Sequence, residues 1–246
     1  QVHNHAEEPR IDVNREAAHL LVQRARDEQR DLLLSEALEI LEYYGIPQVG
    51  SKIALTVEEA QAAAEQMGYP VAIKIIAEQV SHKSDVGGVQ LNLRNESAVK
   101  EAFEDMMERI HAAYPEAKLD GALVQPMVTG GQELILGGRQ DPQFGPVVLV
   151  GLGGIFVEIF EEVQVRVAPI SRQEALGMID GLRGAQILKG ARGHKPADIQ
   201  AIADALLHLS QLLQDFPEIK EIDINPLRVF HENEGCCALD ARMILD

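Results

Sequence analysis

The stretch Val71-Ala72-Ile73-Lys74 constrains this chain most, because it predicts a buried strand that ends in a charged side chain. A polar loop follows, Ser81-His82-Lys83-Ser84-Asp85, and the adjacent glycines Gly87 and Gly88 precede a second strand at 89–93. The carboxyl end of an apolar strand is where α/β sheets commonly present binding groups. The order of strand, polar loop, glycine pair and strand is a suitable local design for holding phosphates.

Composition excludes several classes of protein. The 246 residues suffice for one large domain or two lobes, and 46% of them are hydrophobic, which is enough to build a core. A formal net charge of −17 repels nucleic acid and anionic membranes, so we expect neither as a partner. No apolar run approaches the ~18 residues that span a bilayer. Cys236 and Cys237 are adjacent on an expected strand, and we interpret them as packing residues of a reduced, cytoplasmic protein.

The first half of the chain has α/β patterning. Residues 1–30 are predicted to form a linker and an N-terminal helix. Thr56, followed by Glu58 and Glu59, opens a helix with a capping hydroxyl and acids in its first turn, and this helix ends near Gly68. Apolar spacing and turn residues predict the remaining elements, which are helices at 14–29, 34–44 and 95–113 and strands at 71–76 and 89–93.

From about Gly121 the pattern changes to short, closely spaced strands, which is typical of antiparallel pairing. We therefore predict an α+β (α/β) fold of two lobes, about 47–120 and about 121–246, which meet near Gln125–Gly131 with a cleft between them. The elements expected in the second lobe are strands at 122–127, 133–138, 147–150 and 163–167, helices at 171–180 and 196–214, and strands at 219–224, 226–230 and 236–240.

The lysine, the histidine and the glycines each have two interpretations. The ammonium of Lys74 is suited to phosphate oxygens, although strand-end lysines often only reach solvent. The imidazole of His82 is a competent nucleophile towards phosphorus, and the ordinary alternative is a solvated loop histidine. Gly87 and Gly88 allow a backbone to approach an anion, but they also simply form a turn.

Oxygen donors gather near the other end of the chain. Strand alternation places Glu221, Asp223 and Asn225 on one face, and Asp240 lies on an expected neighbouring strand. Mg²⁺ prefers one or two protein oxygens completed by phosphates and water. These side chains could hold such an ion, or they form a solvated face of the sheet.

The order of the segments resembles a known family. The segments SHKSDVGGV, DPQFGPVVLVGLGGIFVE, EIDINPL and LDARM are similar to those of the ATP-grasp domain of NDP-forming acyl-CoA synthetases. These are the ADP-forming acetate–CoA ligases, relatives of the β subunits of succinyl-CoA synthetase. The resemblance covers about residues 30–245. It implies an ATP-grasp domain over 31–246, with a nucleotide cleft between its lobes, and it implies ATP/ADP and Mg²⁺ as cofactors.

The resemblance also implies roles for individual residues. Lys74 would contact the nucleotide phosphates, and His82 would relay phosphate between a distant phosphohistidine and ADP. Asn225 and Asp240 would bind Mg²⁺, with Asp223 in support. Further implied nucleotide contacts are a hinge at Gln125, Met127 and Val128, where related sequences often have an acid, together with Glu133, the glycines Gly87 and Gly88, and Lys52 as an additional phosphate contact.

The reaction that this family implies joins a carboxylic acid and CoA at the expense of ATP, and it is reversible. It requires a CoA-binding α-type subunit or fused domain, because no Gly-rich segment for CoA occurs in this sequence. Two alternatives stay open. One is a non-catalytic nucleotide-sensing domain of a protein acyltransferase-type regulator, and the other is an ATP-grasp ligase that needs no loop histidine.

Overall fold

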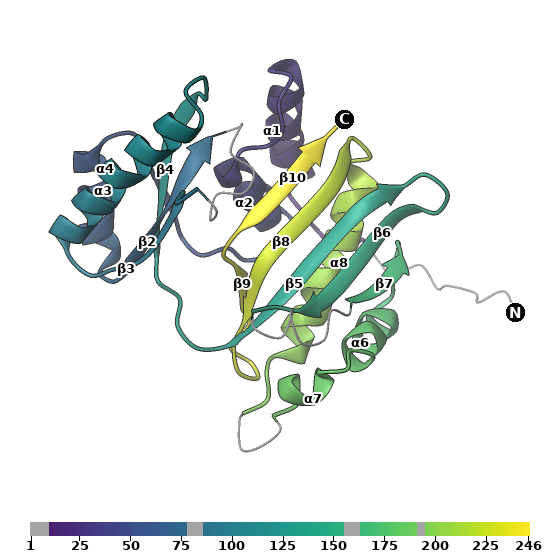
Figure 1. Ribbon diagram of the computed structural model, residues 1–246. Helices are drawn as coiled ribbons and strands as arrows, with labels where there is room; N and C mark the ends of the chain where they lie inside the picture. Colours follow the sequence, from purple (N-terminus) through teal and green to yellow (C-terminus); the bar gives the residue numbers. More distant parts are fainter. Residues whose placement is uncertain (1–9, 78–85, 155–162, 191–194) are drawn as a thin grey trace, which may run out of the picture. The chain divides into compact units, whose positions relative to one another are not determined.

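The computed structural model describes residues 10–77, 86–154, 163–190 and 195–246, and the chain divides into two compact units (Figure 1). The four-stranded unit comprises 33–35 and 49–129. The six-stranded unit comprises the N-terminal segment up to Gln48, apart from 33–35, together with Gly130–Asp246. Each unit has its own sheet.

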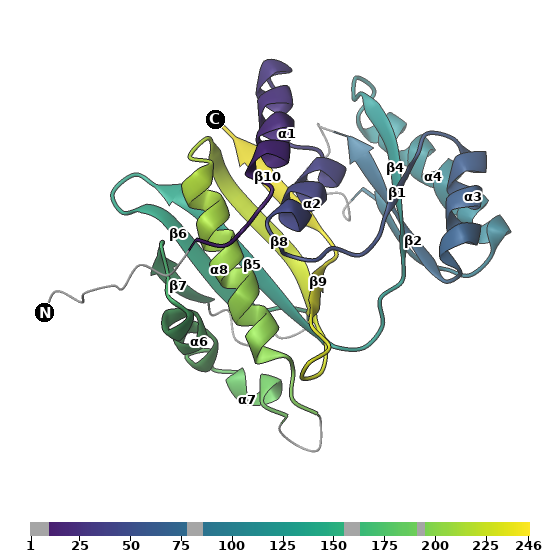
Figure 2. The ribbon, with the colours of Figure 1, turned by 180° about the vertical axis from the view of Figure 1, so that it is seen from behind.

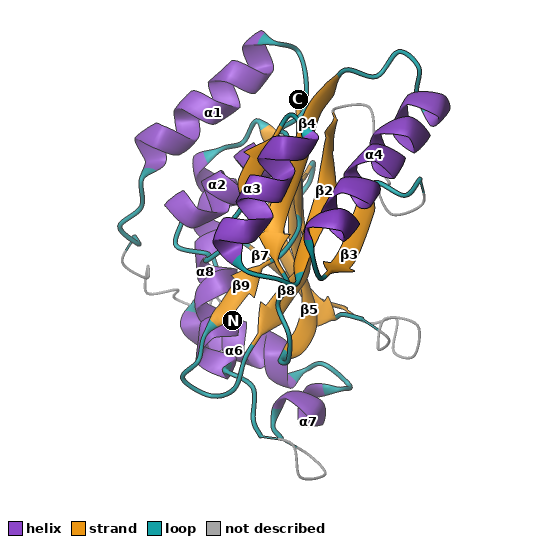
Figure 3. Ribbon diagram, turned by 90° about the vertical axis from the view of Figure 1, so that its left-hand side faces the viewer, coloured by secondary structure: helices purple, strands orange, loops and turns teal. Residues whose placement is uncertain are grey.

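The four-stranded unit is an antiparallel sheet with helices on one face (Figure 3). Ile73, Ile75 and Val124 face these helices and are fully buried among side chains such as Phe103 and Met106. The strand order is β1-β4-β2-β3. The elements are β1 (Lys52–Ala54), α3 (Val57–Met67), β2 (Val71–Ala77), β3 (Val89–Leu93), α4 (Glu96–Ala113) and β4 (Leu119–Pro126).

Both helices of this unit begin at capping side chains. The Thr56 hydroxyl accepts from the Glu59 amide at 3.2 Å, and α3 ends at Gly68, whose φ of 80° suits a residue without Cβ. The Asn95 side chain accepts from the Ala98 amide at 2.9 Å and starts α4. The helices predicted after Thr56 and after Asn95 are confirmed within a residue or two.

The six-stranded unit has a second antiparallel sheet, with α8 lying along one face (Figures 1 and 2). Its strand order is β10-β8-β5-β6-β7, and β9 pairs with β8. The strands are β5 (Gln132–Asp141), β6 (Gly145–Leu152), β7 (Val163–Val167), β8 (Ile219–Val229), β9 (Cys236–Ala238) and β10 (Ala241–Leu245). The helices are α1 (Arg15–Asp27), α2 (Leu34–Tyr43), α6 (Arg172–Asp180), α7 (Ala185–Leu188) and α8 (Ile199–Asp215).

Alternation along the strands gives this sheet two different faces. Leu136, Val148 and Ile222 are fully buried on the face that packs against α8. Gly138 allows the close approach of that helix, since a Cβ there would overlap the Leu213 side chain. The opposite face carries charged and half-exposed residues such as Asp223, and it is the face on which the sequence predicts oxygen ligands.

The predicted boundary between the lobes needs correction. Strand β4 starts at Leu119 and pairs with β1 and β2, so it completes the first sheet and does not begin the second lobe at 121. The division lies between Thr129 and Gly130, inside the predicted meeting region at 125–131. The predicted antiparallel pairing of the later strands is confirmed.

Two further expectations concern the cysteines and the membrane. Cys236 and Cys237 are both free thiols; Cys236 is buried and Cys237 is half-buried, as expected for neighbours on opposite faces. In the described part of the chain, no helix is long and apolar enough to cross a bilayer.

Candidate functional site

Lys74 lies in the middle of β2, on the face of the four-stranded sheet away from α3 and α4, and not at the end of the strand as the sequence predicted, because the strand continues to Ala77. Its neighbours Ile73 and Ile75 face the helices, and it is paired with Leu123 on β4. The side chain is buried, with only 6% of the residue exposed. A buried ammonium is costly unless other groups compensate for its charge, so this position is unusual for a lysine that merely reaches solvent.

Lys52 does not share this face. It is opposite Val124, which belongs to the core beneath the helices, and its ammonium donates to the Gln66 side chain of α3. Lys52 is exposed on the short edge strand β1. The structure therefore does not bring this predicted phosphate contact to Lys74, and we leave it out of the proposed site.

The predicted hinge begins at the end of β4. Gln125 is opposite Ala72 and only 2% exposed, and no hydrogen-bond partner is found for its Nε2. The amide of Met127 donates to the Pro70 carbonyl at 3.0 Å, so this N–H is already engaged. A nucleotide base at this hinge would therefore use other groups, such as the backbone at Val128.

The glycine pair leads into β3. Gly87 has a φ of 74°, and the Gly88 carbonyl accepts from the Ile75 amide at 2.8 Å, so the pair forms a turn that returns the chain to β2. This agrees with the interpretation of the two glycines as a turn. Contact of these glycines with an anion stays a prediction. His82 lies outside the described residues.

Glu133 is held by a charged partner on the neighbouring strand β8. Its carboxylate accepts from Arg228 Nη2 at 2.7 Å, and Arg228 Nη1 also reaches the Gly130 carbonyl at 3.2 Å. A Cβ at Gly154 would come within 2.7 Å of the Glu133 carboxylate, and the Gly153 amide donates to the Glu133 carbonyl. The glycine loop at 151–154 therefore packs closely against Glu133, and Arg228 is a contributor that sequence patterns did not indicate.

Asn225 lies on β8, and Asp240 lies between β9 and β10 rather than on the expected strand at 236–240. The backbone N–H of Asn225 donates to the backbone carbonyl of Asp240 at 3.2 Å, and the next residues, Ile224 and Ala241, are directly paired. Asn225 is exposed and Asp240 half-buried, so both are accessible at the surface of this unit. Two hard oxygen donors opposite one another fit the small protein contribution that Mg²⁺ needs.

Asp223 lies next to this pair, opposite Arg242 of β10. Burial raises the pKa of its carboxyl group, and the negative charges of Glu221 and Asp240 raise it further, while Arg242 opposes them. Carboxylates that disfavour each other's ionised form attract a cation, because the cation relieves their repulsion. In the described residues no group of three or more His, Cys, Asp or Glu side chains is arranged to hold a metal.

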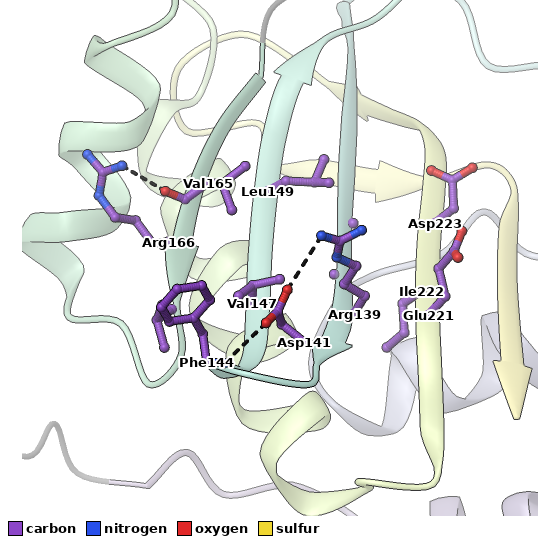
Figure 4. Close-up of a pocket in the computed structure, with 13 residues that line it drawn as sticks. Arg139, Asp141, Phe144, Val147, Leu149, Val165, Arg166, Glu221, Ile222 and Asp223 are labelled. Carbon is purple, nitrogen blue, oxygen red and sulfur yellow. Dashed lines mark hydrogen bonds and ion pairs between the residues drawn. The ribbon is translucent and has the colours of Figure 1, made fainter. Parts of the chain in front are cut away.

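A cavity of about 760 Å³ adjoins these acids on the same sheet face (Figure 4). Glu221 and Asp223 line one side, and Arg139, which pairs with Asp141 at 3.5 Å, lies between them and an apolar wall. The apolar wall consists of Phe144, Val147, Leu149, Val165 and Val167. Sequence reasoning missed this cavity, although the alternating valines of β7 were a signal for an uncovered face.

Comparison with known proteins decides the family. Residues 23–245 match the model of the ATP-grasp domain, which covers most of the chain. The chain belongs to the ATP-grasp family. It is 46% identical over 225 residues to the β subunit of ADP-forming acetate–CoA ligase I of Pyrococcus furiosus, covering 92% of this chain and 96% of that subunit.

A longer relative and a solved structure support the same family. The ADP-forming acetate–CoA ligase I of Archaeoglobus fulgidus is 44% identical over 235 residues, which are 96% of this chain but only 34% of that enzyme. A structure of acetyl-coenzyme A synthetase 1 from Ca. Korarchaeum cryptofilum has a TM-score of 0.80 and 40% identity, and covers 93% of this chain and 100% of that one. It contains coenzyme A and Mg-AMPPCP, and its phosphohistidine segment points towards the nucleotide binding site. This ATP-grasp chain is therefore of the β-subunit type, and it spans about a third of the single-chain ligase.

Proposed function

We propose that this chain is the nucleotide-binding component of an ADP-forming acyl-CoA synthetase. The complete enzyme converts a carboxylic acid, CoA and ATP into acyl-CoA, ADP and phosphate, and it also runs in reverse. The observation that carries the proposal is the match with the Pyrococcus furiosus β subunit over almost the full length of both chains.

Residue roles follow from the chemistry of phosphoryl transfer, which needs positioning and charge neutralisation more than covalent chemistry. Lys74 would neutralise nucleotide phosphate oxygens, and its position on the sheet face away from α3 and α4 supports this role. Asn225 and Asp240 would hold Mg²⁺, with Asp223 adjacent; the bound ion would neutralise charge on the phosphates. The opposed positions of Asn225 and Asp240 support this assignment.

The loop histidine would accept the phosphoryl group. A ring nitrogen of His82 would attack the terminal phosphorus of ATP, the bond from that phosphorus to the bridging oxygen would break, and ADP would leave. Transfer of the group from His82 onwards requires a CoA-binding partner, either a separate α-type subunit or a fused domain. The relatives include a separate β subunit and a longer single-chain ligase, and both support such a partner. We place the assembly in the cytoplasm, where thiols such as Cys236 and Cys237 stay reduced.

Labelling with γ-³²P-ATP and Mg²⁺ tests the relay. We expect acid-labile, base-stable label on the wild-type chain and none on His82→Ala. The matched control is His111→Ala, which removes an exposed histidine from α4 and should leave the label unchanged.

Two results would count against the proposal in different ways. Equal labelling of wild type and His82→Ala would exclude a relay through His82 in this chain. The absence of any magnesium-nucleotide binding would exclude the nucleotide-binding role itself.

A further inference from the structure

Arg139 is a charged residue that the proposed function does not use. It lies on β5, directly opposite Glu221 of β8 and Val147 of β6, and it lines the cavity of about 760 Å³. Figure 4 shows its guanidinium between the apolar wall and the two acids of β8, Glu221 and Asp223. Every residue that lines this cavity belongs to the six-stranded unit, so its geometry does not involve the four-stranded unit.

The strand register places Arg139 close to the proposed magnesium ligands. In the row next to Arg139, Gly137 of β5 is directly opposite Asp223 of β8, and Gly137 adds no side chain to the floor of the cavity. Successive rows on one face of a sheet are roughly 7 Å apart, a distance that the long stem of an arginine can span. An anion that a cation holds beside Asp223 therefore lies within reach of the Arg139 guanidinium.

The contact between Arg139 and Asp141 leaves the guanidinium available. Arg139 Nη2 lies 3.5 Å from Asp141 Oδ2, which is longer than the roughly 2.7–2.9 Å of a strong charge-assisted hydrogen bond. The other carboxylate oxygen of Asp141 accepts from the backbone N–H groups of Gln143 at 2.9 Å and Phe144 at 3.1 Å. Since the turn itself holds Asp141, Arg139 can exchange this weak contact for a more highly charged anion.

The position of Arg139 along β5 indicates which anion this is. A guanidinium presents paired N–H donors that match two oxygens of a phosphate group. Strand β5 begins at Gln132, beside the predicted hinge, and Arg139 lies towards the other end of the strand. A nucleotide that enters from the hinge and carries Mg²⁺ at Asn225 and Asp240 therefore directs its terminal phosphate, and not its base, towards Arg139.

We propose that Arg139 binds the terminal phosphoryl group of the nucleotide, which is the group that is transferred. The inference rests on the proposed function and deepens it, because it assigns a protein cation to the phosphoryl group itself. Arg139 stays protonated and forms no covalent bond. Its guanidinium offsets the negative charge of the phosphoryl oxygens while the bond to the bridging oxygen breaks and the bond to the acceptor nitrogen forms. The apolar wall beside Arg139 limits the access of water to that group.

Isothermal titration with two nucleotides tests this contact, because Mg-AMPPCP carries a terminal phosphoryl group and Mg-ADP lacks one. Arg139→Met should bind Mg-AMPPCP about 10- to 100-fold more weakly than wild type, as for the loss of a hydrogen bond between charged groups. It should bind Mg-ADP with wild-type affinity. Arg139→Lys keeps the charge but not the paired donors, so it should show a smaller loss in the same direction.

Arg166→Met is the matched control. Arg166 also lines the cavity, but its guanidinium donates to the Val165 carbonyl at 2.7 Å and points away from the acids of β8 (Figure 4). This variant should bind both nucleotides with wild-type affinity. Thermal melting of all three variants shows whether each of them is folded.

An equal loss of affinity for Mg-AMPPCP and Mg-ADP in Arg139→Met, or no loss for either, would overturn the inference while leaving the proposed function intact. So would a loss for Mg-AMPPCP in Arg166→Met as large as that in Arg139→Met. If wild type binds neither nucleotide, the proposed function fails and the inference fails with it. Should Arg139→Met not fold, Arg139→Lys decides, since wild-type affinity of that variant for Mg-AMPPCP would also overturn the inference.

Discussion

Cys236 and Cys237 are neighbours in the sequence, but their thiols differ in burial. Both lie on β9, but only Cys236 is buried, and its Sγ contacts the Ala201 carbonyl at 3.7 Å. Burial raises the pKa of the Cys236 thiol to about 12, and nearby negative charge raises it further. Burial also raises the pKa of Cys237, and Arg228 opposes that effect.

We therefore expect the native protein at pH 8 to show no reaction of Cys236 with a thiol reagent, because almost none of it is thiolate. Both thiols should react after denaturation. Since an unfolded thiol ionises near pH 8.5, the unfolded state loses its proton first, and the Cys236 contribution lowers the free energy of unfolding as pH rises from about 8.5 towards 12.

Mass spectrometry of labelled peptides measures this directly. A Cys237→Ser variant, which keeps only the buried thiol, should remain unlabelled in the native state. Rapid native-state labelling of Cys236 in that variant would show that the thiol is neither buried nor protonated as described.

At the scale of elements, Gly138 on β5 controls how closely α8 packs on the sheet. An added Cβ would overlap the Leu213 side chain and lie 2.6 Å from the Val147 carbonyl. Gly138→Ala should lower the free energy of unfolding by about 1–3 kcal/mol, because the helix must shift to relieve the overlap.

Gly177 provides the control in the same unit. It is exposed within α6, with open space around the position of a Cβ, so Gly177→Ala should raise stability by roughly 0.5–1 kcal/mol. Chemical denaturation of the two variants measures both effects. Equal changes in the free energy of unfolding of the two variants would mean that contact with α8 does not determine the destabilisation by Gly138→Ala.

Local patterns predicted most elements but not how they combine. Capping residues and apolar spacing located α3 and α4 well, whereas the strand pairs around Pro226 were misjudged. Pro226 lacks an N–H and suggested a break, yet β8 runs continuously from Ile219 to Val229. The pairing with β5 is irregular only at Asn225 and Pro226, where β8 has one more residue than β5. The short elements β1 and α7 left no periodic signal, and β10 was also missed.

The sequence suggested some residues of the candidate site, but not their burial or the sheet face on which they lie. Residue type and family resemblance proposed Lys74, Asn225 and Asp240 as site residues. The structure shows Lys74 buried and the backbones of the other two adjacent, and their roles stay predictions. Lys52 lies on the other face of the sheet from Lys74, and its phosphate contact stays an untested prediction, because the face of an edge residue depends on its register, which the sequence does not reveal. The unpaired amide of Gln125 also required the structure, since burial and missing partners are tertiary properties.

For the whole molecule, the acidic net charge makes nucleotide binding depend on local compensation. With a formal charge of −17, the chain repels a polyphosphate at long range, and in the proposed function Lys74 and a bound cation offset this repulsion. Affinity for ATP should therefore depend strongly on Mg²⁺ and on the carboxylate of Asp240.

Isothermal titration of Mg-AMPPCP into the intact chain tests this most directly. We predict a single binding site that requires Mg²⁺, an affinity about 10- to 100-fold weaker in Asp240→Asn, and wild-type binding in the control Asp105→Asn, which alters an exposed carboxylate on α4. No heat of binding to wild type, or equal affinity of wild type and Asp240→Asn, would contradict the account.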